Sequence, residues 1–426
     1  MRDRDAYAVY LLLTTASSFC YPMVWIVSTV YMVKDVGLNP LQLVLAGTIQ
    51  QSVNFVFQAP TGALADMYSR RWAVVLGFFL VGAGFLLQGL IPVFAAVLVS
   101  QALTGLGHTI ADGADAAWIA DEIGVERAGP SYLRAAQLGS IASLLGIAAG
   151  VGLAGVRLNL PILASGGLFV AVSVVLAVVM PERHFTPAAR GDRTSWQQLG
   201  HTLRAGMGMV RVQPVLRAIL AIGVFFGLFS AGFDQLWQYH LLRSVGFPTL
   251  GALTAVVWFG IIEAGITVTN MIGVEVARRG VDTTSHHAVG WALFAVDGLT
   301  VIGALGFALA GQFALAMAAF FMMTAARGPR LALERIWMNQ HLDLAVRATV
   351  LSMRGQVGAL AQIAGGPIFG AIAMAYSTRP ALIVAAVILT PALLLYAGVV
   401  RRDGPHVAPI APEALATARD RAEDPV

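Results

Sequence analysis

Twelve long apolar segments, separated by short polar ones, constrain the fold of this chain more than any other feature. A helix needs ~20 apolar residues to cross a bilayer, whereas a membrane-spanning strand needs only ~10. Only helices and closed barrels satisfy every backbone hydrogen bond inside hydrocarbon, so segments of this length are predicted to be helices. The chain is therefore predicted to be an all-α polytopic membrane protein with 12 transmembrane helices, at about residues 6–33, 41–65, 71–90, 92–121, 131–155, 158–180, 214–243, 248–277, 284–309, 311–341, 347–375 and 379–400.

The composition agrees with a lipid environment and argues against other partners. Hydrophobic residues make up 58% of the chain and charged residues 12%, where a soluble domain carries about 25% charged residues. The net charge of +4 comes from arginines in the loops, so the lipid bilayer is the expected partner and nucleic acid is not. The lone Cys20 excludes an intramolecular disulfide.

No motif for catalysis, a cofactor or a metal stands out. The sequence has no Gly-rich Walker loop with a lysine, which argues against direct use of ATP. His286 and His287 form an isolated pair near a loop, without further ligands at metal spacing, and are expected to be surface histidines. The chain is predicted to be neither an enzyme nor a holder of a cofactor or metal.

Arginine is concentrated in alternate loops, which predicts the orientation of the chain. Because cytoplasmic loops carry the excess of basic residues, both termini are predicted to be cytoplasmic. Lysine occurs only at Lys34, a composition typical of bacterial high-GC genomes, so the predicted location is the bacterial inner (plasma) membrane, as a multi-pass protein. The arginine-rich loops carry Arg70, Arg71, Arg127, Arg134, Arg183, Arg190, Arg193, Arg204, Arg278, Arg279, Arg335, Arg347, Arg401 and Arg402.

The longest polar stretch divides the chain into two halves. Six-helix bundles are predicted over residues 1–180 and 214–400, with a cytoplasmic linker at 181–213 and a disordered cytoplasmic tail at 401–426. Within the linker, apolar residues recur at helical spacing and predict an amphipathic helix lying on the membrane. These residues are Trp196, Leu199, Leu203, Met207 and Val210.

A short internal repeat relates the two halves. Trp118 and Trp337 close the fourth and tenth segments, and each is followed by a loop and then by an Arg and a Gln. In this register Asp115 corresponds to Glu334. Two pseudo-symmetric six-helix halves are what a transporter built from parallel repeats requires.

The turn from Gly62 to Arg71 resembles the signature between helices 2 and 3 of the major facilitator superfamily, which reads roughly G-x-L-a-D-r-x-G-r-k. It matches at Gly62, Leu64, Asp66, Arg70 and Arg71, and departs at Met67 and at Ser69, where the family has glycine. The resemblance implies the facilitator fold and a secondary transporter. It also implies a cytoplasmic gate made by Gly62, Asp66, Arg70, Arg71 and Asp121, with Asp66 facing the opening of span 11 and an arginine facing Asp121. The alternative is that Arg70 and Arg71 only anchor the topology.

Other motifs resemble bacterial tetracycline-type and multidrug efflux members of this family. They are Gly113–Glu122, Gly232–His240, and Trp337–Asn339 together with Arg347–Ser352. Span 4 departs from the family because Gln101 replaces the arginine linked to proton coupling. The resemblance implies alternating access and proton-coupled export of amphipathic small molecules by a monomer. Two alternatives remain open: a carrier of a sugar, organic acid or siderophore, and a facilitator-fold protein without transport activity.

Acidic residues inside the predicted spans are the candidates for proton coupling, because a buried charge needs a partner, a wet cavity or a proton. Asp112 lies about 14 Å from the end of span 4, near the midplane, and Asp115 is expected one turn further on the same face. The predicted proton-coupling residues are Asp112, Asp115, Asp234 and Glu263. The alternative is fixed ion pairs, which is favoured for Asp297 and is open for Asp115 and Glu334 beside Arg330 and Arg335.

Polar and aromatic residues of the spans are the candidates for binding the substrate. In span 2, Gln50, Asn54 and Gln58 recur every four residues and form one polar stripe, which either lines a cavity or bonds neighbouring helices. Aromatic residues of spans 7 and 8 either form an apolar pocket or lie in the core. The predicted substrate contacts are Gln50, Asn54, Gln58, Phe229, Trp237, Gln238 and Trp258.

Overall fold

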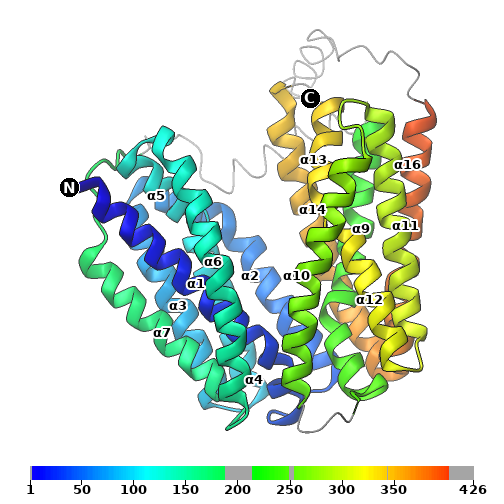
Figure 1. Ribbon diagram of the computed structural model, residues 1–426, viewed down its shortest axis with the longest axis horizontal. Helices are drawn as coiled ribbons and strands as arrows, with labels where there is room; N and C mark the ends of the chain where they lie inside the picture. The colour runs from blue at the N-terminus through cyan, green and yellow to red at the C-terminus, as the bar shows by residue number, and fades with distance from the viewer. Residues whose placement is uncertain (1, 188–213, 249–253, 343, 403–426) are drawn as a thin grey trace, which may run out of the picture. The chain divides into compact units, whose positions relative to one another are not determined.

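The computed structural model describes residues 2–187, 214–248, 254–342 and 344–402, and every regular element in these ranges is helical (Figure 1). This confirms the all-α class. The predicted amphipathic helix around Trp196 to Val210 and nearly all of the predicted tail lie outside the described residues. The predicted domain boundaries at residues 180 and 214 stay a prediction, because residues 188–213 also lie outside the described part of the chain.

The first part of the chain forms seven helices. Asn39 begins the second of them with a capping box, because its side chain accepts the Gln42 N–H at 2.9 Å while the Gln42 side chain accepts the Asn39 N–H at 3.1 Å. The helices are α1 (Arg2–Lys34), α2 (Pro40–Met67), α3 (Arg70–Leu90), α4 (Phe94–Ala111), α5 (Ala114–Ile123), α6 (Val125–Ala154) and α7 (Leu160–Val179).

The second part of the chain is also helical throughout its described residues. Its first helix ends in one wide π-helical turn, η1. The elements are α9 (Pro214–His240), η1 (Leu241–Val245), α10 (Ala255–Gly280), α11 (His286–Leu309), α12 (Phe313–Arg327), α13 (Arg330–His341), α14 (Leu344–Ala375), α15 (Thr378–Ile388) and α16 (Thr390–Arg402).

Ten helices in the described ranges are long and apolar enough to cross a membrane. In this set α4 and α5 count as one span, as do α15 and α16. The set omits α2, whose amide side chains lower its hydropathy, and it omits α12 and α13, which are too short when taken singly. A polytopic helical membrane protein is therefore confirmed, whereas the count of 12 spans and the sidedness of the termini stay predictions.

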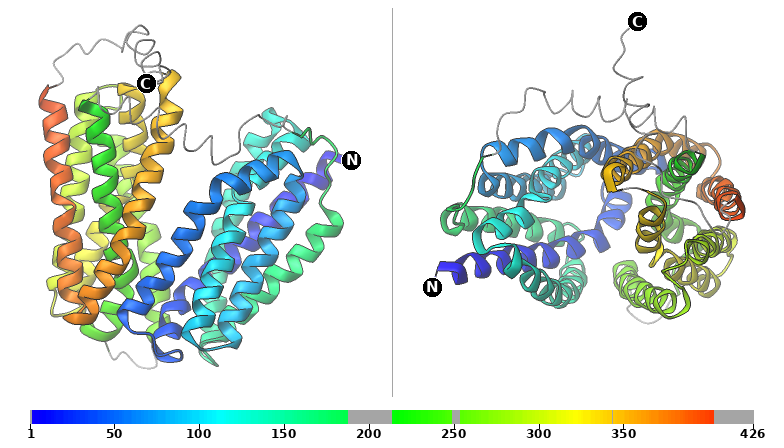
Figure 2. Two further views of the ribbon diagram at one scale, coloured as in Figure 1. Left: turned by 180° about the vertical axis from the view of Figure 1, so that it is seen from behind. Right: turned by 90° about the horizontal axis from the view of Figure 1, so that it is seen from above.

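The contacts divide the chain into two compact units. Unit 1 comprises Met1–Trp196 and Thr249–Glu263, and unit 2 comprises Gln197–Pro248 and Ala264–Val426. Within unit 1, α1 packs on α6, and α3 packs on α4 and α7. Within unit 2, α9 packs on α14 and α11 packs on α12. In each unit the long helices run roughly side by side as a bundle (Figure 2).

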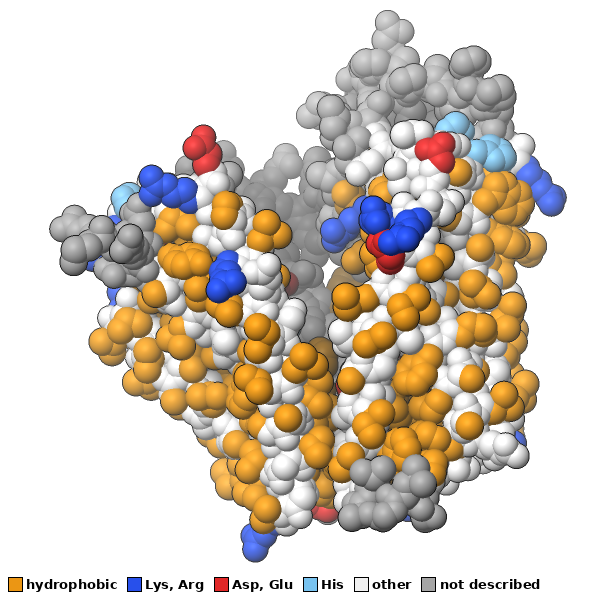
Figure 3. All heavy atoms as spheres, in the orientation of Figure 1, with side chains coloured by type: hydrophobic (Ala, Val, Ile, Leu, Met, Phe, Trp, Pro, Cys, Tyr) orange, Lys and Arg blue, Asp and Glu red, His pale blue; other side chains and the backbone are white. Residues whose placement is uncertain are grey.

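On the face seen in Figure 3, orange apolar side chains are spread along the helices of both units, and the blue and red side chains gather mainly near the helix ends. This distribution is the one that a bilayer requires, because hydrocarbon solvates apolar side chains and water solvates the charges.

Spans 4 and 10 are broken in the middle, and the span made by α15 and α16 is interrupted at Leu389. Between α4 and α5, Gly113 adopts φ +79°, a left-handed conformation that costs glycine nothing. Between α12 and α13 the break falls at Gly328 and Pro329, and proline has no N–H to continue the helical ladder. The expected shared face of Asp112 and Asp115 is therefore wrong, because the helix is not continuous between them.

Close helix packing in unit 1 depends on small residues. A Cβ added to Gly107 of α4 would lie 2.6 Å from the Gly77 carbonyl oxygen of α3, and a Cβ on Gly77 would meet the Gly107 oxygen at the same distance. The two backbones are thus in direct contact, which requires glycine on both sides.

Gly107→Ala is expected to destabilise the protein by about 1–3 kcal/mol, because α3 and α4 must move apart to admit the methyl group. Gly167→Ala in α7 is the matched control, since a Cβ there meets nothing within 4 Å. Thermal unfolding in detergent measures both. Equal unfolding temperatures for wild type and Gly107→Ala would contradict the close packing.

Candidate functional site

The turn between α2 and α3 is shorter than the sequence suggested. Residues 62–67 still belong to α2, so only Tyr68 and Ser69 lie outside a helix. Ser69 has φ −175°, which is extended backbone, and so avoids the positive φ that the family's glycine would allow. Its hydroxyl accepts the Trp72 N–H at 3.0 Å and thereby caps α3. A Cβ on Gly62 would meet nothing within 4 Å, so no steric reason requires glycine there.

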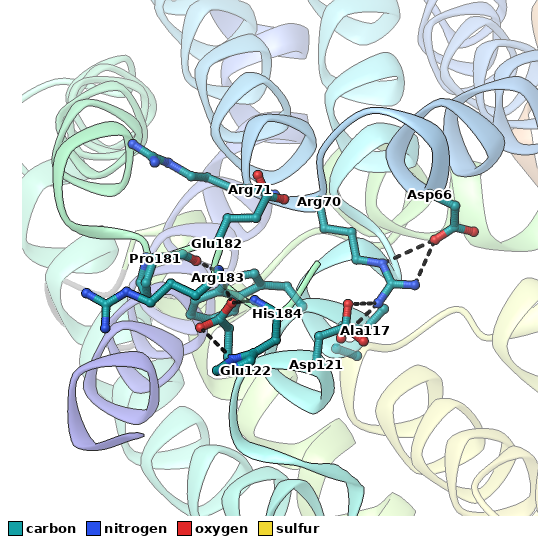
Figure 4. Close-up of polar contacts among 12 residues, drawn as sticks. Asp66, Arg70, Arg71, Ala117, Asp121, Glu122, Pro181, Glu182, Arg183 and His184 are labelled. Atoms are coloured by element: carbon teal, nitrogen blue, oxygen red, sulfur yellow. Dashed lines mark hydrogen bonds and ion pairs between the residues drawn. The ribbon is translucent and has the colours of Figure 1, made fainter. Parts of the chain in front are cut away.

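Arg70 joins three carboxylate and carbonyl groups of unit 1 (Figure 4). Its guanidinium donates to the Asp66 carboxylate at 3.0 and 3.2 Å and to the Ala117 carbonyl at 3.2 Å, and it pairs with Asp121. Because Ala117 and Asp121 lie on α5, this arginine ties the end of α2 and the start of α3 to the second part of the broken span. The contact between Arg70 and Asp121 is the one that the family resemblance implied.

The segment after α7 is bound to the same region (Figure 4). The Glu182 carboxylate accepts the Ser69 hydroxyl at 2.6 Å and the Arg71 N–H at 3.0 Å. The buried Glu122 carboxylate of α5 accepts the backbone N–H groups of Arg183 at 2.6 Å and His184 at 3.1 Å. These bonds make the first residues of the linker part of unit 1.

The gate role of this region stays a prediction. Asp66 is half exposed, with 53% of its side chain accessible. Its predicted partner at the start of span 11 falls where the side chains of residues 344–349 lie outside the described part. The Arg71 side chain donates to the Ala177 carbonyl of α7 and stacks on the Trp72 ring, which is compatible with a topology anchor.

Within the described part of the chain, no cation pairs with the two acids beside the break in span 4. Asp112 is exposed, and its carboxylate has no hydrogen bond or ion pair within the described residues. Asp115 is half-buried, and its carboxylate accepts its neighbour's backbone N–H, from Ala116, at 2.7 Å. Intramembrane carboxylates in this situation require water, a proton or a cationic ligand.

His108 lies one turn before Asp112 and was missed by the sequence analysis. Its Nδ1 is 2.9 Å from the Tyr21 hydroxyl of α1, and the two rings meet edge to face with centroids 5.2 Å apart. Its carbonyl accepts the Asp112 N–H at 2.8 Å. The spacing of His108 and Asp112, four residues apart within an apolar span, was the available signal.

The polar stripe of α2 faces α4 in part. A Cβ added to Gly105 of α4 would lie 3.0 Å from the Asn54 side-chain oxygen and 3.0 Å from the Gln50 carbonyl. The Asn54 side-chain oxygen is buried without a hydrogen-bond partner in the described residues, whereas Gln58 is exposed. This half of the stripe therefore lies between helices, which was one of the two alternatives.

In unit 2 the acid of α9 has a basic partner. Asp234 accepts two bonds from Arg327 of α12, at 2.7 and 3.1 Å, in a bidentate pair. The guanidinium also lies over the rings of Phe226 and Phe229, 5.4 and 5.3 Å from their centroids. This geometry favours the ion-pair alternative for Asp234, because the pair joins α9 to α12.

A second charge network lies deeper in unit 2. Arg330 of α13 donates to Asp297 of α11 at 2.8 Å and to Glu334 at 2.9 Å, and its guanidinium lies 3.6 Å from the centroid of the Phe226 ring. Arg354 of α14 donates to Glu334 at 2.5 and 2.7 Å. Asp297 is fully buried, and the two arginines neutralise the two carboxylates. The ion-pair alternative therefore holds for Asp297 and for Glu334.

The predicted aromatic pocket is largely core. Phe229 is fully buried, and its ring stacks on the Phe233 ring with centroids 5.4 Å apart. Trp237 is 9% exposed, and its ring centroid lies 4.7 Å from that of Phe320. The Phe229 ring has no accessible surface, which favours the core alternative, and its contact with a substrate stays a prediction. The other predicted contacts, Gln238 and Trp258, and the predicted coupling acid Glu263 are half-buried.

The two units differ at the positions that the internal repeat relates. Trp118 and Trp337 are each 1% exposed and lie in the second helix of a broken span. The pair Glu334 and Arg354 is bonded in unit 2. In unit 1, Asp115 is the counterpart of Glu334 and has no arginine partner among the described residues. The Arg134 guanidinium instead donates to Gln137 at 3.2 Å. No group of three or more potential metal ligands occurs among the described residues.

Asp297→Asn is expected to destabilise the protein by about 3–5 kcal/mol, because it leaves the Arg330 charge buried with one partner fewer. Thermal unfolding in detergent measures the change. Glu275→Gln is the matched control: Glu275 also holds two arginines, Arg278 at 2.7 Å and Arg279 at 2.5 Å, but at the exposed end of α10. The account is contradicted when both variants unfold at the same temperature as wild type.

Comparison with known proteins agrees with this geometry. The family model for the Major Facilitator Superfamily matches residues 10–329. The chain is 21% identical, over 84% of its length and 86% of the relative's, to the uncharacterized MFS-type transporter YxaM of Bacillus subtilis strain 168.

Solved transporters have the same fold. A crystal structure of a mutant of the nucleoside transporter NupG superposes with a TM-score of 0.75 at 12% identity, over 92% of this chain and 99% of that one. An unoccupied bacterial homologue of the human lysosomal transporter Spinster gives 0.69 at 12% identity over 95% and 99%, and the peptide transporter POT in complex with sulfate gives 0.69 at 14% identity over 93% and 94%. These matches favour a secondary transporter of a small molecule over an enzyme. The chain belongs to the major facilitator superfamily.

Proposed function

We propose that this protein is a proton-coupled antiporter that exports amphipathic, cationic small molecules, of the tetracycline-type and multidrug class. One observation carries the proposal: in unit 2 the acids of the spans at Asp234, Asp297 and Glu334 are bound by arginines, whereas Asp112 and Asp115 of unit 1 have no cationic partner among the described residues.

The chemistry follows from that difference. A carboxylate held by an arginine stays charged, whereas an unpaired carboxylate in a membrane protein is stabilised by either a proton or a cationic ligand. Proton and substrate then compete for Asp112, and that competition is the basis of antiport. A membrane potential of 100 mV contributes about 2.3 kcal/mol per elementary charge moved, which is sufficient to drive export.

His108 and Tyr21 extend the proposed proton site. A neutral imidazole accepts or donates a proton near physiological pH, and here it is hydrogen-bonded to a phenol at 2.9 Å. We place proton transfer on Asp112 with His108 as its neighbour, and Asp115 as a second acceptor. The sequence analysis also named Glu263 and Asp234 as coupling residues. We keep Glu263 as a further proposed acceptor and assign Asp234 to a fixed pair with Arg327.

The substrate site is proposed to use the half-buried polar residues Gln50, Asn54, Gln238 and Trp258, with Gln58 and Trp237 at its edge. Alternating access is proposed to use the Asp66, Arg70 and Asp121 cluster as the cytoplasmic gate. We further propose cytoplasmic termini, a monomer, and a location in the bacterial inner membrane.

A carrier of a metabolite, such as a sugar, an organic acid or a siderophore, is the main alternative. Arg327 and Arg330 of span 10 would favour binding of an anionic metabolite if their guanidinium groups had no carboxylate partner. Both guanidiniums are bound by carboxylates, which supports a cationic substrate instead. The fold does not decide between substrates, because nucleoside and peptide transporters have it as well.

Proton movement in everted vesicles tests the proposal. With an imposed proton gradient, wild type is expected to release protons from the vesicle lumen when a lipophilic cation or tetracycline is added. Asp112→Asn is expected to abolish this release, because the amide cannot carry the proton. Asp282→Asn is the matched control, since Asp282 is an exposed acid in the loop after α10.

Two results would count against the proposal. One is folded wild-type protein that moves no protons with any compound of the panel, which would shift weight to a metabolite carrier or to a protein without transport. The other is an Asp112→Asn variant that couples as well as wild type.

The break at Gly113 is proposed to be the flexible joint of span 4. Gly113→Ala would strain the left-handed backbone by about 1–2 kcal/mol, so transport is expected to slow by roughly 5–30-fold at equal amounts of folded protein. Gly129→Ala is the control, because neither glycine has an atom within 4 Å of an added Cβ and only Gly113 has positive φ. Equal initial rates for the two variants would exclude the joint.

A further inference from the structure

Unit 1 has a pocket at the end of its helices that is opposite to the Asp66 and Arg70 cluster. Its volume is about 450 Å³. Three loops form it: the loop after α1, the loop between α3 and α4, and the loop between α6 and α7. It is lined by Tyr31, Asp35, Gly89, Leu90, Pro92, Arg157, Leu158 and Asn159. Nothing in the proposed transport mechanism uses it.

The walls of this pocket are held by hydrogen bonds. The Tyr31 hydroxyl donates to the Gln88 carbonyl at 2.8 Å, and the Asn159 side-chain amide donates to the Gly89 carbonyl at 3.2 Å. These bonds tie the end of α1 and the start of α7 to the end of α3. The pocket is therefore a fixed feature of the unit.

Two opposite charges share the pocket without neutralising each other. Asp35 and Arg157 both line it and are both exposed, and neither makes an ion pair with any described residue. A carboxylate and a guanidinium that face one pocket in this way present one acceptor and one donor to a single guest. A ligand carrying both an ammonium and an acidic group would satisfy both.

Apolar residues at the pocket, or next in the chain to its lining residues, are exposed. Leu90 is 66% exposed, Val156 is 73% exposed, and Ile91 and Val93 are 45% and 49% exposed. All four lie at the ends of predicted spans, where the hydrocarbon of a bilayer meets water. Side chains of this kind, beside a charged pocket, favour a guest whose body is lipid and whose head is polar.

We infer that this pocket binds the headgroup of a zwitterionic phospholipid of the ethanolamine class. Arg157 would contact the phosphate, for which a guanidinium is well suited because it offers paired N–H donors. Asp35 would accept N–H bonds from the primary ammonium. A choline headgroup has no N–H to donate, and an anionic glycerol headgroup has no cation for Asp35.

Native mass spectrometry of the purified full chain in micelles with equal amounts of phosphatidylethanolamine, phosphatidylcholine and phosphatidylglycerol tests the inference. Wild type is expected to retain phosphatidylethanolamine in preference to both others. Asp35→Asn is expected to reduce the ratio of bound ethanolamine lipid to glycerol lipid by about tenfold, and Arg157→Gln to reduce binding of both by a similar factor.

Lys34→Gln is the matched control, because Lys34 is an exposed base beside Asp35 that does not line the pocket. It is expected to leave the ratio unchanged. A ratio that Asp35→Asn leaves unchanged, or lipid binding that Arg157→Gln leaves unchanged, would overturn the inference, provided that thermal unfolding shows each variant folded. Displacement of the lipid by an equal concentration of free phosphoethanolamine would also overturn it, in favour of a soluble zwitterion. The assay needs no transport, so its outcome is independent of the proposed function.

Discussion

The free-energy cost of placing a charge in hydrocarbon explains how the ionisable residues of this protein are paired. In unit 2 that cost is offset by direct pairing: Asp234 is bound by Arg327, and Asp297 is bound by Arg330. These pairs join α9 to α12 and α11 to α13, so the same interactions that neutralise the charges also fix the helices to one another. In unit 1, Asp112 has no ion pair among the described residues, and in the proposed mechanism a proton and a cationic substrate bind it in turn.

The two broken spans that the internal repeat relates show the same contrast in the contacts that hold each side of the break. In span 10 the break at Gly328 and Pro329 is flanked by two arginines, each bound to an acid of a different helix, so both sides of the break are clamped. In span 4 the two sides of the break at Gly113 are held differently. Arg70 and the linker segment bind α5. The α4 side is held by neutral hydrogen bonds, from Tyr21 to His108 and from Thr61 to the Thr109 carbonyl, and by no ion pair within the described residues. The two breaks that the internal repeat relates therefore differ in the charges that hold them.

The sequence sufficed for the class, the family and the contact between Arg70 and Asp121, because these follow from apolar length and from a motif of adjacent residues. Pairings between distant positions could not be predicted, since Asp234 and Arg327 are 93 residues apart and only the packing of α9 on α12 brings them together. A single φ angle at Gly113 removed Asp115 from the expected face. Phe229 showed an aromatic pattern that suits a pocket and a core equally well, and burial decided for the core.

The central claim is that substrate displaces a proton from unit 1 and not from unit 2. Its most direct test is the proton release from purified protein in weakly buffered detergent on addition of tetraphenylphosphonium, a lipophilic cation. The account predicts that wild type and Asp234→Asn release about one proton for each cation bound, and that Asp112→Asn binds the cation without releasing any. Release that persists in Asp112→Asn and disappears in Asp234→Asn would contradict it.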